Sequence, residues 1–386
     1  MRKHFEFPDK LDISLSCASG VERVLKGELK RLGLPEAPSI NGLTTFSGSA
    51  LDVARLNVNL RTADRVYIKL GEFNATTFDQ LFDGVSAIAF ERFIPSDAKI
   101  VVNGKCVKST LFAISACQSI IKKAIVVRLS SKFNVRSLEE SGALYEIVFS
   151  VYKDVVTILL NTSGQGLHKR GYRDLVGIAP IKETLASALI LMSDFYYKNP
   201  FADPFCGSGT MVIEAAKIAL NIAGGISRRF AFNEWHNFDS KYYSQAYEQA
   251  KDNEFRDRKV EIFGSDVDVK AVELSKRHAE RAGLKNYVNF KVCSVEHFST
   301  DKANGTIVTN PPYGERVYDK KQAEQCYKWL KQSYLKLDNW SLFLITSATN
   351  FERCFKLRAS RVKKLYNSNK ECNFYYYYKQ KEKTDD

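Results

Sequence analysis

The fold expected for this chain of 386 residues is decided by one stretch, Asp203-Pro204-Phe205-Cys206-Gly207-Ser208-Gly209-Thr210. An apolar strand at 201–203 runs into it, and an apolar helix at 210–222 follows it. Ligands of open α/β sheets bind at the carboxyl ends of the strands, where glycines let the backbone approach them closely. The stretch therefore predicts a ligand-binding turn in a doubly wound parallel sheet.

The chemistry of this turn favours a cationic ligand. A dinucleotide fingerprint needs a third glycine where Val212 stands, and a P-loop needs a Lys followed by Ser or Thr. The carboxylate of Asp203 would repel a pyrophosphate but attract an amino group. S-adenosylmethionine carries both an ammonium and a sulfonium, so we expect this cofactor.

Strands alternate with helices around this turn, which is typical of a doubly wound sheet. A helix at 182–197 precedes it. Beyond it we expect a strand ending at 266, a helix at 269–282, strands at 288–293, 305–309 and 340–346, and a hairpin of 361–366 and 371–378. The hairpin would close the sheet with antiparallel strands.

Asp266 ends the strand that follows an insert of about 35 residues. An acidic side chain at that place can accept hydrogen bonds from both hydroxyls of a ribose. The next carboxylate, Asp268, is expected to cap the helix that begins at Val269. Asp266 is therefore a second candidate cofactor contact.

The sequence Asn310-Pro311-Pro312-Tyr313 directly follows the strand at 305–309. The prolines hold the loop extended, which leaves the Asn310 side-chain oxygen and the Pro311 carbonyl as acceptors of nearly fixed direction. Two acceptors on an exocyclic amine would favour its pyramidal form and aim its lone pair at an incoming methyl group. Tyr313 would stack on the base, a contact of about 1–3 kcal/mol. These four are the candidate catalytic residues, and the reaction needs no strong general base.

The first 163 residues have a different character. Strands are expected at 11–17, 65–70, 99–102, 145–151 and 155–160, and helices at 21–32, 79–88 and 109–129. This pattern indicates a mixed α/β region without a glycine-rich phosphate loop. The polar, basic segment 161–173 marks a domain boundary.

The net charge of +13 favours a polyanionic partner, and both halves of the chain are basic. An ordinary cationic surface is the alternative. No apolar run reaches the ~20 residues of a membrane span, and residues 1–9 lack the apolar core of a secretory signal. We therefore expect a cytosolic protein with no membrane partner. The eight cysteines are scattered without zinc-site spacing, so no metal is expected either.

Asp203–Gly209 and Asn310–Tyr313 together resemble the class I, S-adenosylmethionine-dependent amino-methyltransferases. Nearly the whole chain is similar to the THUMP-containing RNA methyltransferases, through segments at 60–66, 78–81, 108–112, 118–124, 164–173, 179–183, 230–235 and 310–317. In particular it resembles the bacterial rRNA guanine-N2 methyltransferases, in the form of the N-terminal module of the larger fused large-subunit enzyme.

The resemblance implies a ferredoxin-like subdomain at 1–60, a THUMP domain that grips RNA at 61–163, and a Rossmann-like methyltransferase domain at 164–386. Its implied product is N2-methylguanosine, with the target base held by Asn310 through Tyr313. By motif position it implies these cofactor contacts: Pro180, Lys182, Glu183, Asp203, Phe205, Cys206, Gly207, Ser208, Gly209, Asp266, Ser294 and Asn310.

Ser294 departs from the pattern of these enzymes. They usually place an Asp after the strand at 290–292, where it accepts a hydrogen bond from the adenine amino group. A hydroxyl accepts that bond more weakly than a carboxylate does. The departure bears on cofactor affinity and not on the type of reaction.

Seven basic residues are candidate contacts to the RNA backbone, and such contacts are expected to weaken in salt. They lie in the THUMP-like region and in the boundary segment: Lys105, Lys108, Lys122, Lys123, Lys169, Arg170 and Arg173. For each of them, an ordinary solvated charge is the alternative.

Motifs and resemblance together predict a methyltransferase that acts on guanine N2 in large-subunit (23S) rRNA. A tRNA guanine-N2 methyltransferase shares the same architecture. A DNA adenine-N6 methyltransferase uses the same Asn-Pro-Pro-Tyr chemistry, although the THUMP-like first half argues against it. The third alternative is a non-catalytic RNA-binding protein, which would fail to bind S-adenosylmethionine.

Overall fold

The computed structural model describes residues 7–35, 37–40, 42–173, 181–314, 319–368 and 370–379. The chain divides into two compact units, neither of them continuous in sequence. The first contains Met1–Cys17, Leu29–Leu167 and Arg228–Gln249, and the second contains Ala18–Glu28, His168–Ser227 and Ala250–Asp386. The three domain boundaries expected from the sequence stay predictions.

The first unit is built on a seven-stranded sheet with the order β2-β3-β1-β4-β7-β6-β5. Its strands are β1 Leu11–Cys17, β2 Ser39–Ile40, β3 Leu43–Gly48, β4 Ala63–Asn74, β5 Lys99–Val107, β6 Leu144–Tyr152 and β7 Val155–Asn161. Its helical segments are α2 Ala50–Asn59, α3 Phe78–Ser86, η1 Phe90–Arg92, α4 Ile114–Phe133, η2 Ala231–Glu234 and most of α7 Ser240–Asp252.

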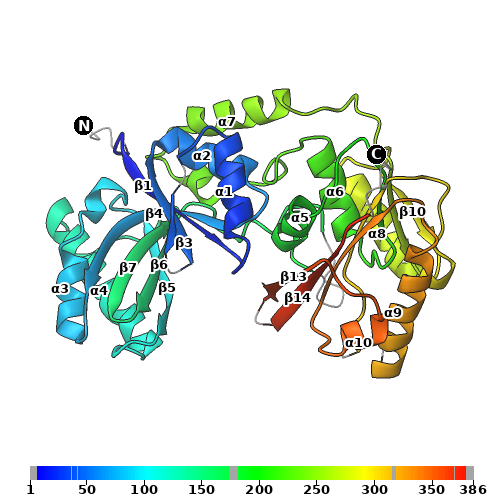
Figure 1. Ribbon diagram of the computed structural model, residues 1–386. Helices are drawn as coiled ribbons and strands as arrows, with labels where there is room; N and C mark the ends of the chain where they lie inside the picture. The colour runs from blue at the N-terminus through cyan, green and yellow to red at the C-terminus, as the bar shows by residue number, and fades with distance from the viewer. Residues whose placement is uncertain are drawn as a thin grey trace, which may run out of the picture. The chain divides into compact units, whose positions relative to one another are not determined.

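Alternating side chains fix the register of this sheet. Strand β6 buries every second residue from Tyr145 to Val151, and this spacing places the buried side chains on one face. Helices α3 and α4 pack against each other and cover β4 and β5, at the left of Figure 1. Strand β5 pairs with β6 in parallel, whereas the other neighbouring strands are antiparallel.

Residues 228–249, which follow α6 in the sequence, belong to the first unit. The indole N–H of Trp235 donates to the carbonyl of Leu144 at 2.9 Å. Its ring stacks on Tyr145, with ring centroids 4.6 Å apart. The Tyr145 hydroxyl in turn donates to Asn237 at 2.6 Å. The core of the first unit is therefore completed by residues from much later in the chain.

The second unit is built on a sheet with the order β10-β9-β8-β11-β12-β14-β13. Its strands are β8 Phe201–Asp203, β9 Ile262–Asp266, β10 Asn289–Val292, β11 Thr306–Thr309, β12 Ser341–Thr346, β13 Arg361–Asn367 and β14 Lys370–Tyr377. The strands from β10 to β12 are parallel, and the hairpin of β13 and β14 is antiparallel. The predicted doubly wound sheet, closed by a hairpin, is confirmed.

Helices cover both faces of this second sheet. They are α5 Glu183–Met192, α6 Thr210–Ala219, α8 Val269–Arg281, η3 Val295–His297, α9 Lys320–Tyr334 and α10 Phe351–Phe355. Most of α1 Glu22–Arg31 is also assigned to this unit. Tyr375 and Tyr377 pack in the core beneath α9 and α10, which are orange in Figure 1. Tyr376 points to the opposite face, where its hydroxyl reaches the Met192 sulfur of α5 at 3.8 Å. The parallel strands thus end in a turn region framed by α6, α8 and α9.

The bounds of helices α5 and α4 differ from those that the apolar pattern predicts, since α5 ends earlier and α4 Ile114–Phe133 lies further along the chain. Helix α5 ends at Met192 because Asp194 accepts hydrogen bonds from Thr306 and Ser341 in the adjoining strands. Helix α4 begins at Ile114 because the backbone N–H of Thr110 is bound by Asp154. Within the described residues, no helix is long and apolar enough to span a bilayer.

Candidate active site

Asp203 closes strand β8 and is buried. Its Oδ1 accepts hydrogen bonds from the backbone N–H of Phe205 at 3.0 Å and from the Thr309 hydroxyl at 2.6 Å. Burial raises the pKa of this carboxyl to about 7, against the opposing effect of both hydrogen bonds. Asp203 is therefore a carboxylate that a cationic ligand can help to ionise.

The glycine turn is tied to the end of strand β9. The backbone N–H of Gly207 donates to Asp266 Oδ2 at 2.9 Å. Gly209 has a φ of +85°, and a Cβ there would stand 2.8 Å from the Cβ of Ser275. Only glycine fits that position, because both the conformation and the contact exclude a side chain. The turn is thus held with its backbone close to the space in front of the strands.

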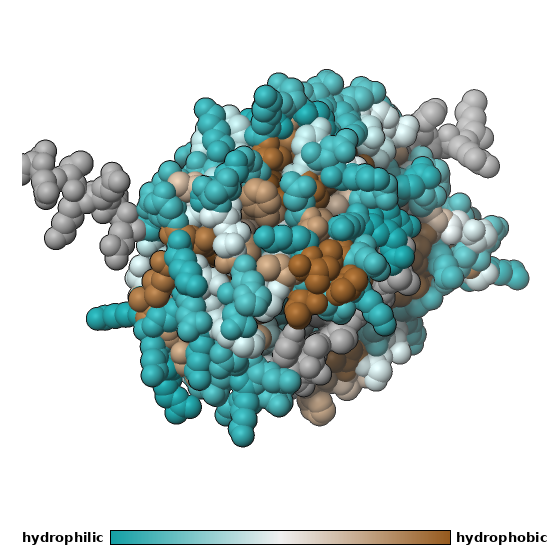
Figure 2. Space-filling model, turned by 90° about the vertical axis from the view of Figure 1, so that its right-hand side faces the viewer, coloured by the Kyte–Doolittle hydropathy of each residue, from teal (hydrophilic) through white to brown (hydrophobic). Residues whose placement is uncertain are grey.

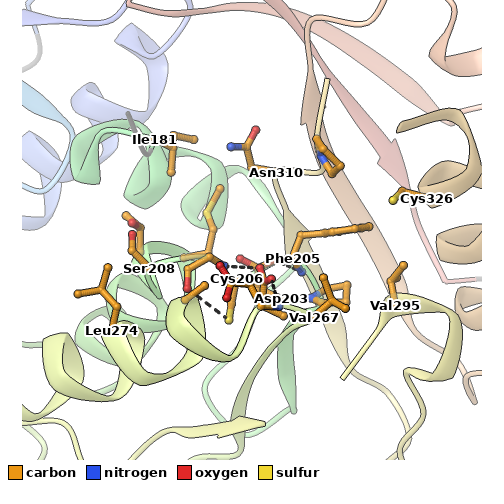
Figure 3. Close-up of a pocket in the computed structure, with 18 of the residues that line it drawn as sticks. Ile181, Asp203, Phe205, Cys206, Ser208, Val267, Leu274, Val295, Asn310 and Cys326 are labelled. Carbon is orange, nitrogen blue, oxygen red and sulfur yellow. Dashed lines mark hydrogen bonds between the residues drawn. The ribbon is translucent and has the colours of Figure 1, made fainter. Parts of the chain in front are cut away.

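This space is a cavity of about 640 Å³. Figure 3 shows Asp203, Cys206 and Ser208 from the turn in its centre, with Leu274 and Asn310 on different sides. Eight of the predicted cofactor contacts line it: Asp203, Phe205, Cys206, Gly207, Ser208, Asp266, Ser294 and Asn310. The structure therefore gathers the glycine turn, the acidic residue and the Asn-Pro-Pro-Tyr loop around one volume.

Three other expected cofactor residues, Lys182, Glu183 and Gly209, do not line the cavity. Gly209 and Glu183 are buried. Pro180 lies outside the described residues. Ser294 lines the cavity while its hydroxyl also caps η3, accepting from the backbone N–H of Glu296 at 3.4 Å.

The Asn-Pro-Pro-Tyr loop leaves the carboxyl end of β11. Asn310 and Pro312 line the cavity, and the Tyr327 hydroxyl fixes the Pro312 carbonyl at 2.8 Å. Pro311 is buried, and neither it nor Tyr313 contributes to the lining. The Tyr313 hydroxyl donates a hydrogen bond to Asn310 Oδ1. Burial raises the pKa of Tyr313, so the phenol remains a neutral donor.

One of the expected RNA contacts, Arg170, needs correction, and a second, Arg173, lies at the cavity. The Arg170 side chain is completely buried, with its guanidinium 3.6 Å from Glu214. Burial alone would favour a protonated Glu214, but Arg170 and Lys217 lower its pKa. Arg173 lines the cavity and pairs with Glu183 at 3.2 Å. Arg170 is therefore not presented to RNA, whereas contact between RNA and the partly exposed Arg173 stays a prediction.

The remaining lysines have more open settings. Lys105, Lys108, Lys123 and Lys169 are exposed. Lys122 pairs with Glu140 at 2.9 Å. Their contact with RNA stays a prediction. The face shown in Figure 2 is mainly hydrophilic, with smaller groups of apolar residues between the charged ones.

Several residues of the cavity were not predicted. Arg173 was expected only as an RNA contact, and Ile181 lies in the segment 179–183 noted in the sequence. The others are Pro204, Thr210, Met211, Val267, Asp268, Lys270, Ala271, Leu274, Val295, Cys326 and Trp329. Val267 lines the cavity and is 54% exposed. Its position directly after Asp266 was the available signal. Cys326 and Trp329 come from α9. No motif in that helix indicated that these two side chains would line the cavity.

Comparisons with known proteins agree with this architecture. Residues 12–67 match the RlmL ferredoxin-like domain, residues 75–161 match the THUMP domain, and residues 170–375 match the family described as RMKL-like, methyltransferase domain. A Bacillus subtilis protein named "Putative RNA methyltransferase YpsC" is 42% identical over 371 residues, which cover 96% of each chain.

Solved structures give the same picture. SMU.472, a methyltransferase by its description and crystallised with SAH, is 38% identical with a TM-score of 0.92, covering 98% of this chain and 100% of its own. A Listeria monocytogenes protein described as a "predicted N6-adenine-specific DNA methylase" is 40% identical with a TM-score of 0.91, covering 96% and 97%.

Proposed function

The chain belongs to the RMKL-like methyltransferases, and we propose on this basis that it methylates the exocyclic N2 of a guanine in large-subunit rRNA. The family resemblance noted in the sequence is confirmed, with a THUMP domain ahead of the catalytic domain. The THUMP domain and the name of the Bacillus relative both support RNA as the class of substrate.

S-adenosylmethionine is the cofactor, as in the related protein that was crystallised with SAH, its demethylated product. Bound in the cavity, it would supply the electrophilic methyl group. The residues present fit it: Asp266 would accept from the ribose hydroxyls, and Val267 would cover one face of the adenine. The volume of about 640 Å³ lies in the range of ordinary small-molecule sites.

One observation carries the proposed reaction: Asn310 opens onto the same cavity as Asp203 and Asp266. An acceptor of nearly fixed direction therefore stands where a planar amine would meet the cofactor. The Asn310 oxygen and the Pro311 carbonyl would take the two N–H groups of the amine. The lone pair would then point at the methyl group that the bound cofactor supplies, and this positioning would account for most of the rate.

The target base must leave its stack to reach Asn310, at a cost of a few kcal/mol. Before it arrives, the Asn310 oxygen holds the Tyr313 hydroxyl. The base amine would replace this phenol, and the Tyr313 ring would then stack on the base. Pro312 keeps its place meanwhile, because Tyr327 holds its carbonyl.

The name of the Listeria structure points to DNA adenine instead. The same four residues serve adenine N6, so the motif itself does not separate the two bases. The THUMP domain supports RNA, because DNA enzymes carry a target-recognition domain in its place. A tRNA guanine remains the nearest alternative to rRNA.

Nucleoside mass spectrometry of size-fractionated RNA, from cells with and without the gene, tests the proposal. Loss of one N2-methylguanosine from large-subunit rRNA is the expected result. Loss from tRNA alone would keep the chemistry and overturn the substrate. If both RNA pools were unchanged while N6-methyladenine fell in DNA, the DNA reading would replace it.

A further inference from the structure

Arg173 is the one basic residue of the boundary segment that lines the cavity among the described residues. Its guanidinium pairs with Glu183 Oε1 at 3.2 Å, at the start of α5. It also donates to the Thr210 hydroxyl, at the start of α6, and lies 3.4 Å from the Ile181 carbonyl. These contacts fix the guanidinium beside the glycine turn.

The Nε of Arg173 is buried and has no hydrogen-bond partner within the described part of the chain. An unsatisfied buried donor is costly, and native structures usually satisfy it with protein, water or ligand. Only 19% of the side chain is exposed, so bulk water has little access to it. The Nε is closed to the cavity as well, so any ligand contact of Arg173 falls to the part of the side chain that lines the cavity.

The charges around the cavity are unevenly distributed. Its described walls carry the carboxylates Asp203, Asp266 and Asp268, against two cations, Arg173 and Lys270. Lys270 stands in the first turn of α8, two residues after Asp268, on the side assigned above to ribose and adenine. Arg173 stands at the N-terminus of α6, next to the glycine turn. A cofactor bound with its ribose at Asp266 would therefore bring its methionine end toward Arg173.

The methionine part of S-adenosylmethionine carries a carboxylate as well as an ammonium. Asp203 attracts the ammonium but would repel the carboxylate, which therefore needs a donor of its own. We propose that Arg173 binds the α-carboxylate of the cofactor, aided by the partial positive charge at the start of α6. Glu183 acts as a positioning residue that holds the guanidinium in place.

The inference rests on the cofactor but not on which base is methylated. Isothermal titration calorimetry of the full chain tests it with two ligands, S-adenosylmethionine and its decarboxylated form, which keeps the amine and the sulfonium. The wild type should bind the complete cofactor about 10- to 100-fold more tightly, as expected for a charge-assisted bond. Arg173→Gln should abolish this preference, because only the complete cofactor uses the guanidinium.

Lys270→Gln is the matched control, since it removes the other cation of the cavity. It should leave the preference between the two ligands intact. Arg173→Lys should restore part of it, because the charge returns without the forked geometry. If Arg173→Gln weakened both ligands equally, the arginine would be only structural and the proposal would fail. Equal affinities for the wild type would overturn it even if the variants did not fold.

Discussion

The Thr309 hydroxyl donates a 2.6 Å hydrogen bond to Asp203 Oδ1, and both residues are buried. This bond joins the ends of β8 and β11, from which the glycine turn and the Asn310 loop emerge. The adjacent strands β8 and β11 therefore fix the position of Asp203, on the cofactor side, relative to Asn310, on the base side. The active site depends on strand register as much as on its loops.

Cofactor affinity should rise with pH through the neutral range. Burial raises the pKa of Asp203 to about 7, so about a tenth of it is ionised at pH 6 and about nine-tenths at pH 8. The ammonium of S-adenosylmethionine binds better to the ionised carboxylate of Asp203, so binding of the cofactor releases the carboxyl proton. Calorimetry should therefore show affinity about tenfold higher at pH 8 than at pH 6.

Asp203→Asn is the control for this pH dependence. The amide keeps the shape of the carboxyl but does not titrate, so affinity should be low and nearly flat between the two pH values. If the variant kept the wild-type slope, another group would be responsible for it.

Asn310→Ala should separate binding from catalysis. It removes the acceptor that orients the amine, so methyl transfer should fall by on the order of a hundredfold or more. S-adenosylmethionine binding should be nearly unchanged, because other residues contact the cofactor. Asn286→Ala, on the exposed surface, is the control and should alter neither. Loss of binding together with transfer would assign the loop another role.

Tyr313→Phe and Tyr313→Ala should act in opposite directions. The phenylalanine variant lacks the hydroxyl that occupies Asn310, so kcat/KM should rise by up to about fivefold, a gain of about 1 kcal/mol. The alanine variant loses the stacking ring, and its kcat/KM should fall by the equivalent of about 1–3 kcal/mol. Steady-state kinetics on the RNA substrate would measure both variants. Equal losses would contradict the proposal that the base amine replaces the Tyr313 hydroxyl on Asn310.

Breaking the buried pair of Arg170 and Glu214 should destabilise the protein strongly. Arg170→Met leaves the Glu214 carboxylate buried without its main cation, at a cost of about 3–5 kcal/mol. Urea unfolding would measure this loss. Combining it with Glu214→Gln should recover part of the stability, because no unpaired charge then remains. Lys169→Ala, at an exposed neighbour, should cost less than about 0.5 kcal/mol.

The sequence was sufficient for the parts of the site that are local. The glycine turn and the Asn-Pro-Pro-Tyr loop each follow a short strand, so residue types and spacing alone place them at one sheet edge. Asp268 caps α8 as predicted, since its side chain binds the backbone N–H two residues ahead. Such features depend on neighbours within one turn of chain.

The two arginines show where sequence reasoning ends. Arg170 and Arg173 lie three residues apart in a polar segment, which is typical of a solvated, RNA-facing surface. Their actual partners lie in two later helices: Glu214 of α6 is 44 residues from Arg170, and Glu183 of α5 is ten residues from Arg173. Burial of a charge depends on such tertiary partners, which no local pattern reveals.

Residues 228–249 complete the core of the first unit, and this has a consequence for synthesis on the ribosome. When residue 167 has been made, Tyr145 still lacks the ring of Trp235 and the side chain of Asn237. The first unit cannot finish folding until much of the catalytic half has been translated. A gene fragment that stops at the apparent boundary therefore encodes an incomplete core, and a self-sufficient fragment must include 228–249.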